Sequence, residues 1–124
     1  MKNLDLKISP LANQQLDEFY AYCSISYGCK KADTIYVLIK RTFNDFCIFP
    51  GMGQIEPLLS DYPQCFRSFT QHPNTKIIYW VEDNAVKIAL LFYTRQAPEK
   101  LRYTIENRTD WICEPPSPPY GEQK

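Results

Sequence analysis

Residues 76–95, KIIYWVEDNAVKIALLFYTR, decide the predicted fold of this chain. Residues 76–82 and 85–93 are rich in β-branched and aromatic side chains, which favour strands. Asp83 and Asn84 between them tolerate the positive φ angles that a two-residue hairpin turn requires. The stretch therefore predicts two long antiparallel strands joined by a tight turn.

The predicted turn also determines which side chains share a face of the hairpin. With this loop, Tyr79 lies opposite Ile88, and Ile77 lies opposite Leu90. Because side chains alternate along a strand, one face carries an apolar set that needs a cover: Ile77, Tyr79, Val81, Val86, Ile88, Leu90 and Phe92. The other face mixes small, aromatic and charged residues, and we expect it to meet water or a partner.

Two amphipathic helices precede the hairpin, and we expect them to cover its apolar face. After a short half-buried strand at residues 4–8, Ser9-Pro10 provides an N-cap and a first helical residue. The first helix ends at Gly28, and its apolar stripe comprises Ala12, Leu16, Phe19, Tyr20 and Cys23. The second helix runs from about residue 30 to residue 49, with a stripe of Ala32, Ile35, Leu38, Ile39, Thr42, Phe46 and Phe49.

The segments on either side of the hairpin are less regular. Residues 51–63 contain two glycines and two prolines and predict an irregular connection. Residues 66–70 resume strand character before a turn at His72. After the hairpin, Pro98-Glu99 suits the first turn of a helix that continues to about residue 107.

Together these segments predict an α+β fold. An N-terminal strand and an antiparallel two-helix hairpin pack on an antiparallel meander sheet, and a short C-terminal helix follows. We expect one domain at residues 1–108. Residues 109–124 hold four closely spaced prolines and predict an extended proline-rich tail.

The composition argues against several classes of function. The formal net charge is zero, so charge indicates neither a nucleic acid nor a membrane surface as a partner. Five cysteines without a CxxC pair and a single histidine lack the spacing of a metal site, and we expect no metal and no cofactor. The sequence has no hydrophobic signal core and no apolar run of about 18 residues. We therefore expect a reduced, cytoplasmic protein.

Five segments, in this order and spacing, are typical of one superfamily. They cover about residues 4–101: ISPLANQQLDEFYAYC at 8–23, FPGMG at 49–53, FRSF at 66–69, IIYWVEDNAVKIALLFYTRQ at 77–96 and PEKL at 98–101. In this arrangement the chain resembles the RelE/ParE superfamily of bacterial type II toxins. The resemblance implies a small toxin, linked to growth inhibition and plasmid stabilisation, that a cognate antitoxin neutralises.

Two activities occur on this fold, and the fold does not choose between them. RelE-like members cut messenger RNA in the ribosomal A site, whereas ParE-like members inhibit DNA gyrase without being hydrolases. A third interpretation is an interaction module that keeps the fold without toxicity. In each case the chain is expected to contact DNA only indirectly, through the antitoxin.

If the chain is a nuclease, the resemblance implies catalytic roles for Arg67 and Arg95, whose counterparts stabilise charge at the phosphate. A proton carrier is also needed. The family's C-terminal tyrosine or histidine has no aligned counterpart, so Tyr93 or else Tyr103 is the substitute. Residues 51–63 also lack the basic residues that nuclease members place there. These departures favour ParE-like inhibition of gyrase, and the alternative for both arginines is pairing with surface carboxylates.

Four large side chains are predicted to bind the antitoxin: Trp80, Leu91, Tyr93 and Trp111. The first three cluster on the hairpin face that we expect to be open, and exposed aromatic patches usually have a partner. Trp111 stands in an otherwise polar segment. The alternative is that the cluster lies beneath the C-terminal helix and that Trp111 folds back on the domain's own core.

Overall fold

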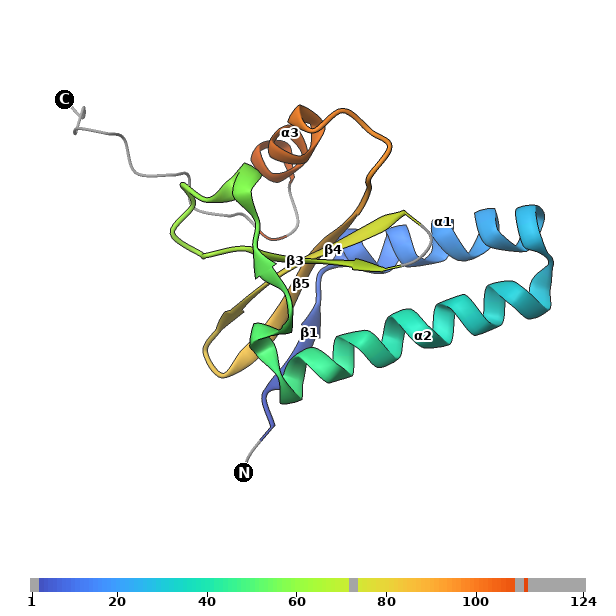
Figure 1. Cartoon of the computed structure of the whole chain (residues 1–124), viewed down its shortest axis with the longest axis horizontal. Coiled ribbons are helices and arrows are strands. Elements are labelled where there is room, and N and C mark those ends of the chain that lie inside the picture. Colours follow the sequence, from blue (N-terminus) through green and yellow to red (C-terminus); the bar gives the residue numbers. More distant parts are fainter. Residues whose placement is uncertain (1–2, 72–73, 109–110, 112–124) are drawn as a thin grey trace.

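The computed structural model describes residues 3–71, 74–108 and 111, and it shows an α+β fold in three layers (Figure 1). A five-stranded sheet of order β1-β5-β4-β3-β2 forms the middle layer. Helices α1 and α2 cover one face of the sheet, while α3 and the segment before β3 cover the other. The predicted fold class is confirmed.

The strands of the sheet are β1 (Asp5–Ile8), β2 (Gln54–Ile55), β3 (Arg67–Gln71), β4 (Thr75–Glu82) and β5 (Ala85–Tyr93). β5 has β4 antiparallel on one side and β1 parallel on the other. The turn residues Asp83 and Asn84 have φ angles of 55° and 62°. The hairpin that the sequence predicts is therefore confirmed, and the N-terminal strand joins its second strand.

The helical segments are α1 (Pro10–Tyr27), α2 (Cys29–Ile48), α3 (Glu99–Asn107) and the 3-10 turns η1 (Pro50–Met52) and η2 (Pro57–Leu59). Ser9 caps α1 as predicted, because its side chain accepts a hydrogen bond from the amide of Ala12 at 2.9 Å. Gly28 separates α1 from α2 with a φ of 93°, a conformation that favours glycine. The two helices thus form the predicted hairpin.

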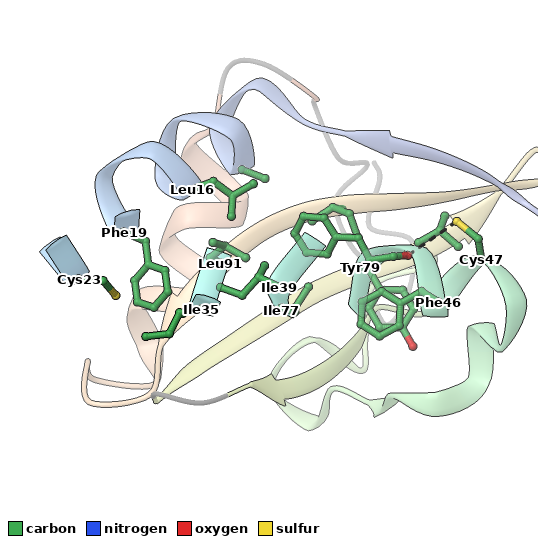
Figure 2. Close-up of a cluster of buried hydrophobic side chains, with 14 of the residues drawn as sticks. Leu16, Phe19, Cys23, Ile35, Ile39, Phe46, Cys47, Ile77, Tyr79 and Leu91 are labelled. Atoms are coloured by element: carbon green, nitrogen blue, oxygen red, sulfur yellow. Dashed lines mark hydrogen bonds between the residues drawn. The ribbon is translucent and has the colours of Figure 1, made fainter. Parts of the chain in front are cut away.

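The first core lies between this helical hairpin and the sheet, and Figure 2 shows side chains from both layers pointing toward one another. Each fully buried aliphatic or aromatic side chain contributes about 1.5 to 3 kcal/mol. The predicted stripe of α2 is wrong at two positions, since Leu38 and Phe49 are 42% and 67% exposed. Phe43 and Cys47 are buried in their place, because α2 turns its positions 42, 43, 46 and 47 inward.

A β-bulge in the hairpin changes which side chains face this core. Up to Tyr79 the register is the predicted one, but the next pairs are shifted by one, so that Ile77 lies opposite Leu91 rather than Leu90. One extra residue moves every later side chain of a strand to the other face. The prediction that Leu90 and Phe92 face the helices is therefore wrong, and both pack in a second core.

Side chains from outside the sheet satisfy the backbone groups at the bulge. The carbonyl of Ala89 accepts hydrogen bonds from Ser9 Oγ at 2.8 Å and from Arg108 at 2.9 Å. The amide of Leu91 donates to Gln15 Oε1 at 2.8 Å. Because unpaired buried backbone groups are costly, these contacts stabilise the shifted register.

The sheet face that we expected to meet water or a partner is buried. Its core comprises Leu59, Tyr62, Phe66, Ile78, Trp80, Ala89, Leu90, Phe92, Leu101 and Ile105. Arg102 holds α3 against the segment before β3, with hydrogen bonds to both carboxylate oxygens of Asp61 at 2.7 and 3.1 Å. The expectation of an open face is wrong because residues 57–66, predicted in large part as an irregular connection, supply apolar side chains that close it.

Most of the predicted tail, and the turn predicted at His72, lie outside the described residues. Trp111 is described, and its ring meets that of Trp80 edge to face with the ring centroids 5.8 Å apart. This contact agrees with the fold-back interpretation of Trp111. Within residues 3–71, 74–108 and 111, no helix is both long and apolar enough to cross a membrane.

Candidate functional site

The guanidinium of Arg67 is held by a hydrogen bond to another part of this chain. It begins β3, where it lies opposite Tyr79 of β4, and it is partly buried. Its Nη1 donates a hydrogen bond of 2.6 Å to the carbonyl of Gly53. The partner is thus a backbone oxygen and not the carboxylate of the alternative interpretation, and the guanidinium holds the loop that follows α2.

Tyr79, which is paired with Arg67 across β3 and β4, holds the same loop. Its hydroxyl donates to the carbonyl of Pro50 at 2.8 Å and accepts from the amide of Gly53 at 2.9 Å. Burial raises the pKa of this phenol, although the Gly53 amide and the charge of Arg67 act in the opposite direction. The phenol is therefore neutral near pH 7, and it serves as a structural clamp.

Tyr93 and Arg95 lie at the other end of the sheet, beside α1. Two cavities of about 270 and 280 Å³ adjoin there, since both are lined by Tyr22, Tyr93 and Gln96. We call them together the α1 groove. The first cavity also reaches Phe19 and Leu91, and the second reaches Tyr27 and Arg95.

The two arginines do not converge. Arg67 lies opposite Tyr79, whereas Tyr93 lies opposite Thr75. The two positions on β4 are four residues apart, which corresponds to about 13 Å along a strand. Arg95 follows Tyr93 by two residues, and the guanidinium of Arg67 is anchored at Gly53. A single phosphate held by both arginines does not fit this arrangement.

Tyr93 is not tuned for acid–base chemistry. Burial raises the pKa of Tyr93, and the nearby Cys23, Tyr22 and Tyr27 add to the shift. The fraction of phenolate at neutral pH is therefore even smaller than for an ordinary tyrosine. Tyr103 is 65% exposed on α3, which packs on the opposite face of the sheet.

The chain shares its fold with a solved structure described as "Chromosomal ParDE TA system from P. aeruginosa". The superposition has a TM-score of 0.63 at 18% sequence identity, and it covers 74% of this chain and 97% of that chain. No protein-family model and no curated protein matches the sequence.

The fold is RelE/ParE-like. This fold places the predicted partner-binding residues in different environments. Trp80 is 6% exposed, with its ring between those of Phe66 and Trp111, and Leu91 is 7% exposed in the first core. The predicted cluster of Trp80, Leu91 and Tyr93 on one open face is therefore wrong, because the bulge and α3 separate its members.

The RelE/ParE-like fold also places at the groove two tyrosines that the sequence analysis did not single out. Tyr22 and Tyr27 of α1 are 51% and 48% exposed at the groove. The rings of Tyr22 and Phe19 each meet that of Tyr93 edge to face, with centroids 6.3 and 5.9 Å away. The sequence signal that could have indicated Tyr22 and Tyr27 was that both are tyrosines of α1 outside the apolar stripe of this helix.

Metal chemistry receives no support from the described part of the chain. Among these residues, no three histidine, cysteine, aspartate or glutamate side chains gather closely enough to hold a metal ion. The described cysteines lie apart and free, with Cys23 and Cys47 buried and Cys29 and Cys65 exposed.

Proposed function

We propose that this chain is the toxin of a type II toxin–antitoxin system, that a cognate antitoxin neutralises it, and that it acts as ParE-like toxins do, by inhibiting DNA gyrase. The support for a toxin is the fold shared with a chain of a ParDE structure, together with the family segments of the sequence. Fold alone carries no activity. The choice of target therefore rests on the site.

One observation favours gyrase over RNA cleavage: the anchoring of Arg67 on Gly53, away from Tyr93 and Arg95. Cleavage through a 2′-hydroxyl needs charge stabilisation and proton transfer at the same phosphate. Residues 51–63 also contain no lysine or arginine to hold RNA. A surface that binds a protein target requires neither arrangement.

The direct test is supercoiling of relaxed plasmid by purified gyrase with this chain added. We expect inhibition at micromolar protein and relief of the inhibition when the cognate antitoxin is added. The antitoxin is sought in the neighbouring reading frame, as a short protein with a DNA-binding segment. Full supercoiling activity at micromolar toxin would refute gyrase as the target.

Ribosome-dependent cleavage of messenger RNA is the second candidate. It is favoured by one observation, the presence of Tyr93 and Arg95 in the same cavity. The test is the double variant Arg67→Ala and Arg95→Ala, with circular dichroism to verify that it folds. If these arginines act on the phosphate, the variant loses growth arrest and cleavage on ribosomes. Growth arrest that persists in the folded double variant would exclude them as the active groups.

The third candidate is an interaction module without toxicity, which the neutral net charge and the lack of basic residues at 51–63 also fit. Expression of the chain without its antitoxin separates this candidate from both toxins. A toxin arrests growth in this experiment, whereas a non-toxic module leaves the growth rate unchanged at the same protein level.

A further inference from the structure

The α1 groove exists because β1 is shorter than the strand it pairs with. β1 ends at Ile8, opposite Ile88, and the rest of β5 has no strand on that side. α1 lies there instead, and Gln15 takes the amide of Leu91. The bulge turns Leu91 and Tyr93 toward α1. The result is an open groove between a helix and a strand end.

The aromatic walls of the groove are suited to binding a large apolar side chain. Phe19, Tyr22 and Tyr93 form a continuous set of edge-to-face rings. Aromatic side chains offer much contact area, and they have few rotatable bonds to immobilise on binding. The hydroxyls of Tyr22 and Tyr93 form no hydrogen bond with any residue that the structure describes, so both remain available to a ligand.

The charges at the two ends of the groove differ in sign. Arg95 lines the second cavity, is exposed, and makes no hydrogen bond or ion pair with a described residue. Glu18 lines the first cavity and is exposed, with Gln14 donating to its carboxylate at 3.0 Å. An occupant that complements this groove therefore carries a negative charge at the Arg95 end.

The length of the groove limits the conformation of the occupant. Glu18 and Tyr27, which line opposite ends, are nine residues apart on α1, or about 14 Å along its axis. An extended peptide covers that distance with about four residues. Because Gln15 already occupies the Leu91 amide, recognition depends on side chains and not on strand pairing at that position.

We propose that the α1 groove binds a short extended segment of a partner protein, with a large apolar residue against the rings of Tyr22 and Tyr93 and an acidic residue at Arg95. The inference stands on the groove itself and does not require toxicity. Where it meets the proposed function, the segment belongs to the antitoxin. If the peptides do not bind, the supercoiling experiment can still support gyrase inhibition. If gyrase is not inhibited, peptide binding can still support the groove as a binding site.

The test is a titration of the isotope-labelled full chain, followed by amide resonances, with two probes, acetyl-Gly-Leu-Phe-Asp-amide and acetyl-Gly-Leu-Phe-Lys-amide. We expect the acidic peptide to bind more tightly and to shift the amides of Tyr22, Leu91 and Gln96. In Arg95→Glu, the ratio of the two dissociation constants should change about fivefold or more in favour of the lysine peptide. Arg41→Glu, an exposed arginine of α2 outside the groove, should leave the ratio unchanged.

A second pair of variants tests the aromatic wall. Tyr22→Ala should weaken binding of both peptides about tenfold, while Tyr103→Ala, which removes a 65% exposed ring on α3, should not. The proposal is overturned if millimolar peptide shifts no groove amide, or if Tyr22→Ala or Arg95→Glu behaves as its control does. Concentration-dependent shifts of the same amides without peptide would assign the groove to a second copy of this chain and would also overturn it.

Discussion

The phenol oxygen of Tyr79 lies 2.9 Å from the amide nitrogen of Gly53, and this contact fixes the loop between α2 and β2. Tyr79→Phe removes the hydroxyl and leaves the amide of Gly53 and the carbonyl of Pro50 without this partner. We expect a loss of about 1 to 3 kcal/mol in the free energy of unfolding, measured by urea denaturation. Tyr103→Phe is the matched control, since Tyr103 is 65% exposed. Equal stability of the two variants would contradict the clamp.

Two glycines of the same loop are expected to respond differently to alanine. A Cβ atom at Gly53 would lie 2.7 Å from the hydroxyl oxygen of Tyr79 and 2.8 Å from the carbonyl oxygen of Ser68, whereas a Cβ at Gly51 meets nothing within 4 Å. Gly53→Ala should cost about 1 to 3 kcal/mol through overpacking. Gly51→Ala should stay within about 0.5 kcal/mol of the parent. Thermal unfolding of both variants measures this difference in stability. Equal stability of the two variants would contradict the close packing around Gly53.

The buried carboxylate of Glu56 should make stability depend on pH. Burial by itself raises the pKa of Glu56, but the amide of Leu58, the ammonium of Lys76 at 2.9 Å and the hydroxyl of Ser68 together lower it below its ordinary value. A lowered folded-state pKa means that the stabilisation is present above the unfolded pKa and is lost as pH falls through the folded one. We therefore expect the parent to lose stability as pH falls below about 5.

Glu56→Gln isolates this contribution. At pH 7 the variant should be less stable by about 2 to 3 kcal/mol, because it removes hydrogen bonds to a charged group and leaves Lys76 unpaired. The deficit should shrink at low pH, where the parent carboxylate is protonated as well. Urea unfolding at a series of pH values measures both effects. A deficit that stays constant from pH 7 to the acid limit would show that Glu56 is not the titrating group.

Ser9 is expected to contribute more than an ordinary helix cap. Its Oγ accepts from the amide of Ala12 and also donates to the carbonyl of Ala89 at the bulge. Ser9→Ala removes both contacts, and we expect a loss of about 2 kcal/mol in the free energy of unfolding. Ser26→Ala, at an exposed position of α1, serves as the control. A cost no larger than that of the control would mean that the bulge does not depend on Ser9.

Much of the fold could be predicted because its signals are local. Ser9-Pro10 marks the start of α1, Asp83-Asn84 marks the hairpin turn, and each works through the conformation of a few neighbouring residues. The alternation in residues 4–8 likewise gave the N-terminal strand. These elements are where the predicted boundaries agree with the structure to within a residue or two.

The bulge and the second core could not be predicted in the same way. From Ile88 to Phe92 every residue is apolar, so a shift of one position changes the faces without breaking any pattern. Such a continuous apolar run is itself typical of a strand buried on both faces. That signal favoured a second core. The residues that cover this second face include 57–66, however, and their glycine- and proline-rich surroundings indicated only a loop.

The candidate site depended on long-range register, which no local pattern contains. The separation of Arg67 from Tyr93 follows from the pairing of three strands. The sequence indicated both residues as candidates, but it did not indicate how far apart they lie. The contributions of Tyr22 and Tyr27 to the groove required the packing of α1 on the sheet. The sequence analysis therefore singled out Tyr93 and Arg95 as candidates, and it did not single out Tyr22 and Tyr27, which line the same cavity.

The pairing of β1 with β5 has a consequence for biosynthesis. Ser9 and Ala89, whose side chain and carbonyl meet at the bulge, are 80 residues apart in the sequence. Contacts between such distant positions close a large loop, and they form late. At about 5 to 20 residues per second, the nascent chain waits on the order of ten seconds between the two. A nascent chain that has not yet reached Gln96 therefore has neither a finished sheet nor a complete groove, and whatever the groove binds can engage the chain only after that residue has been made.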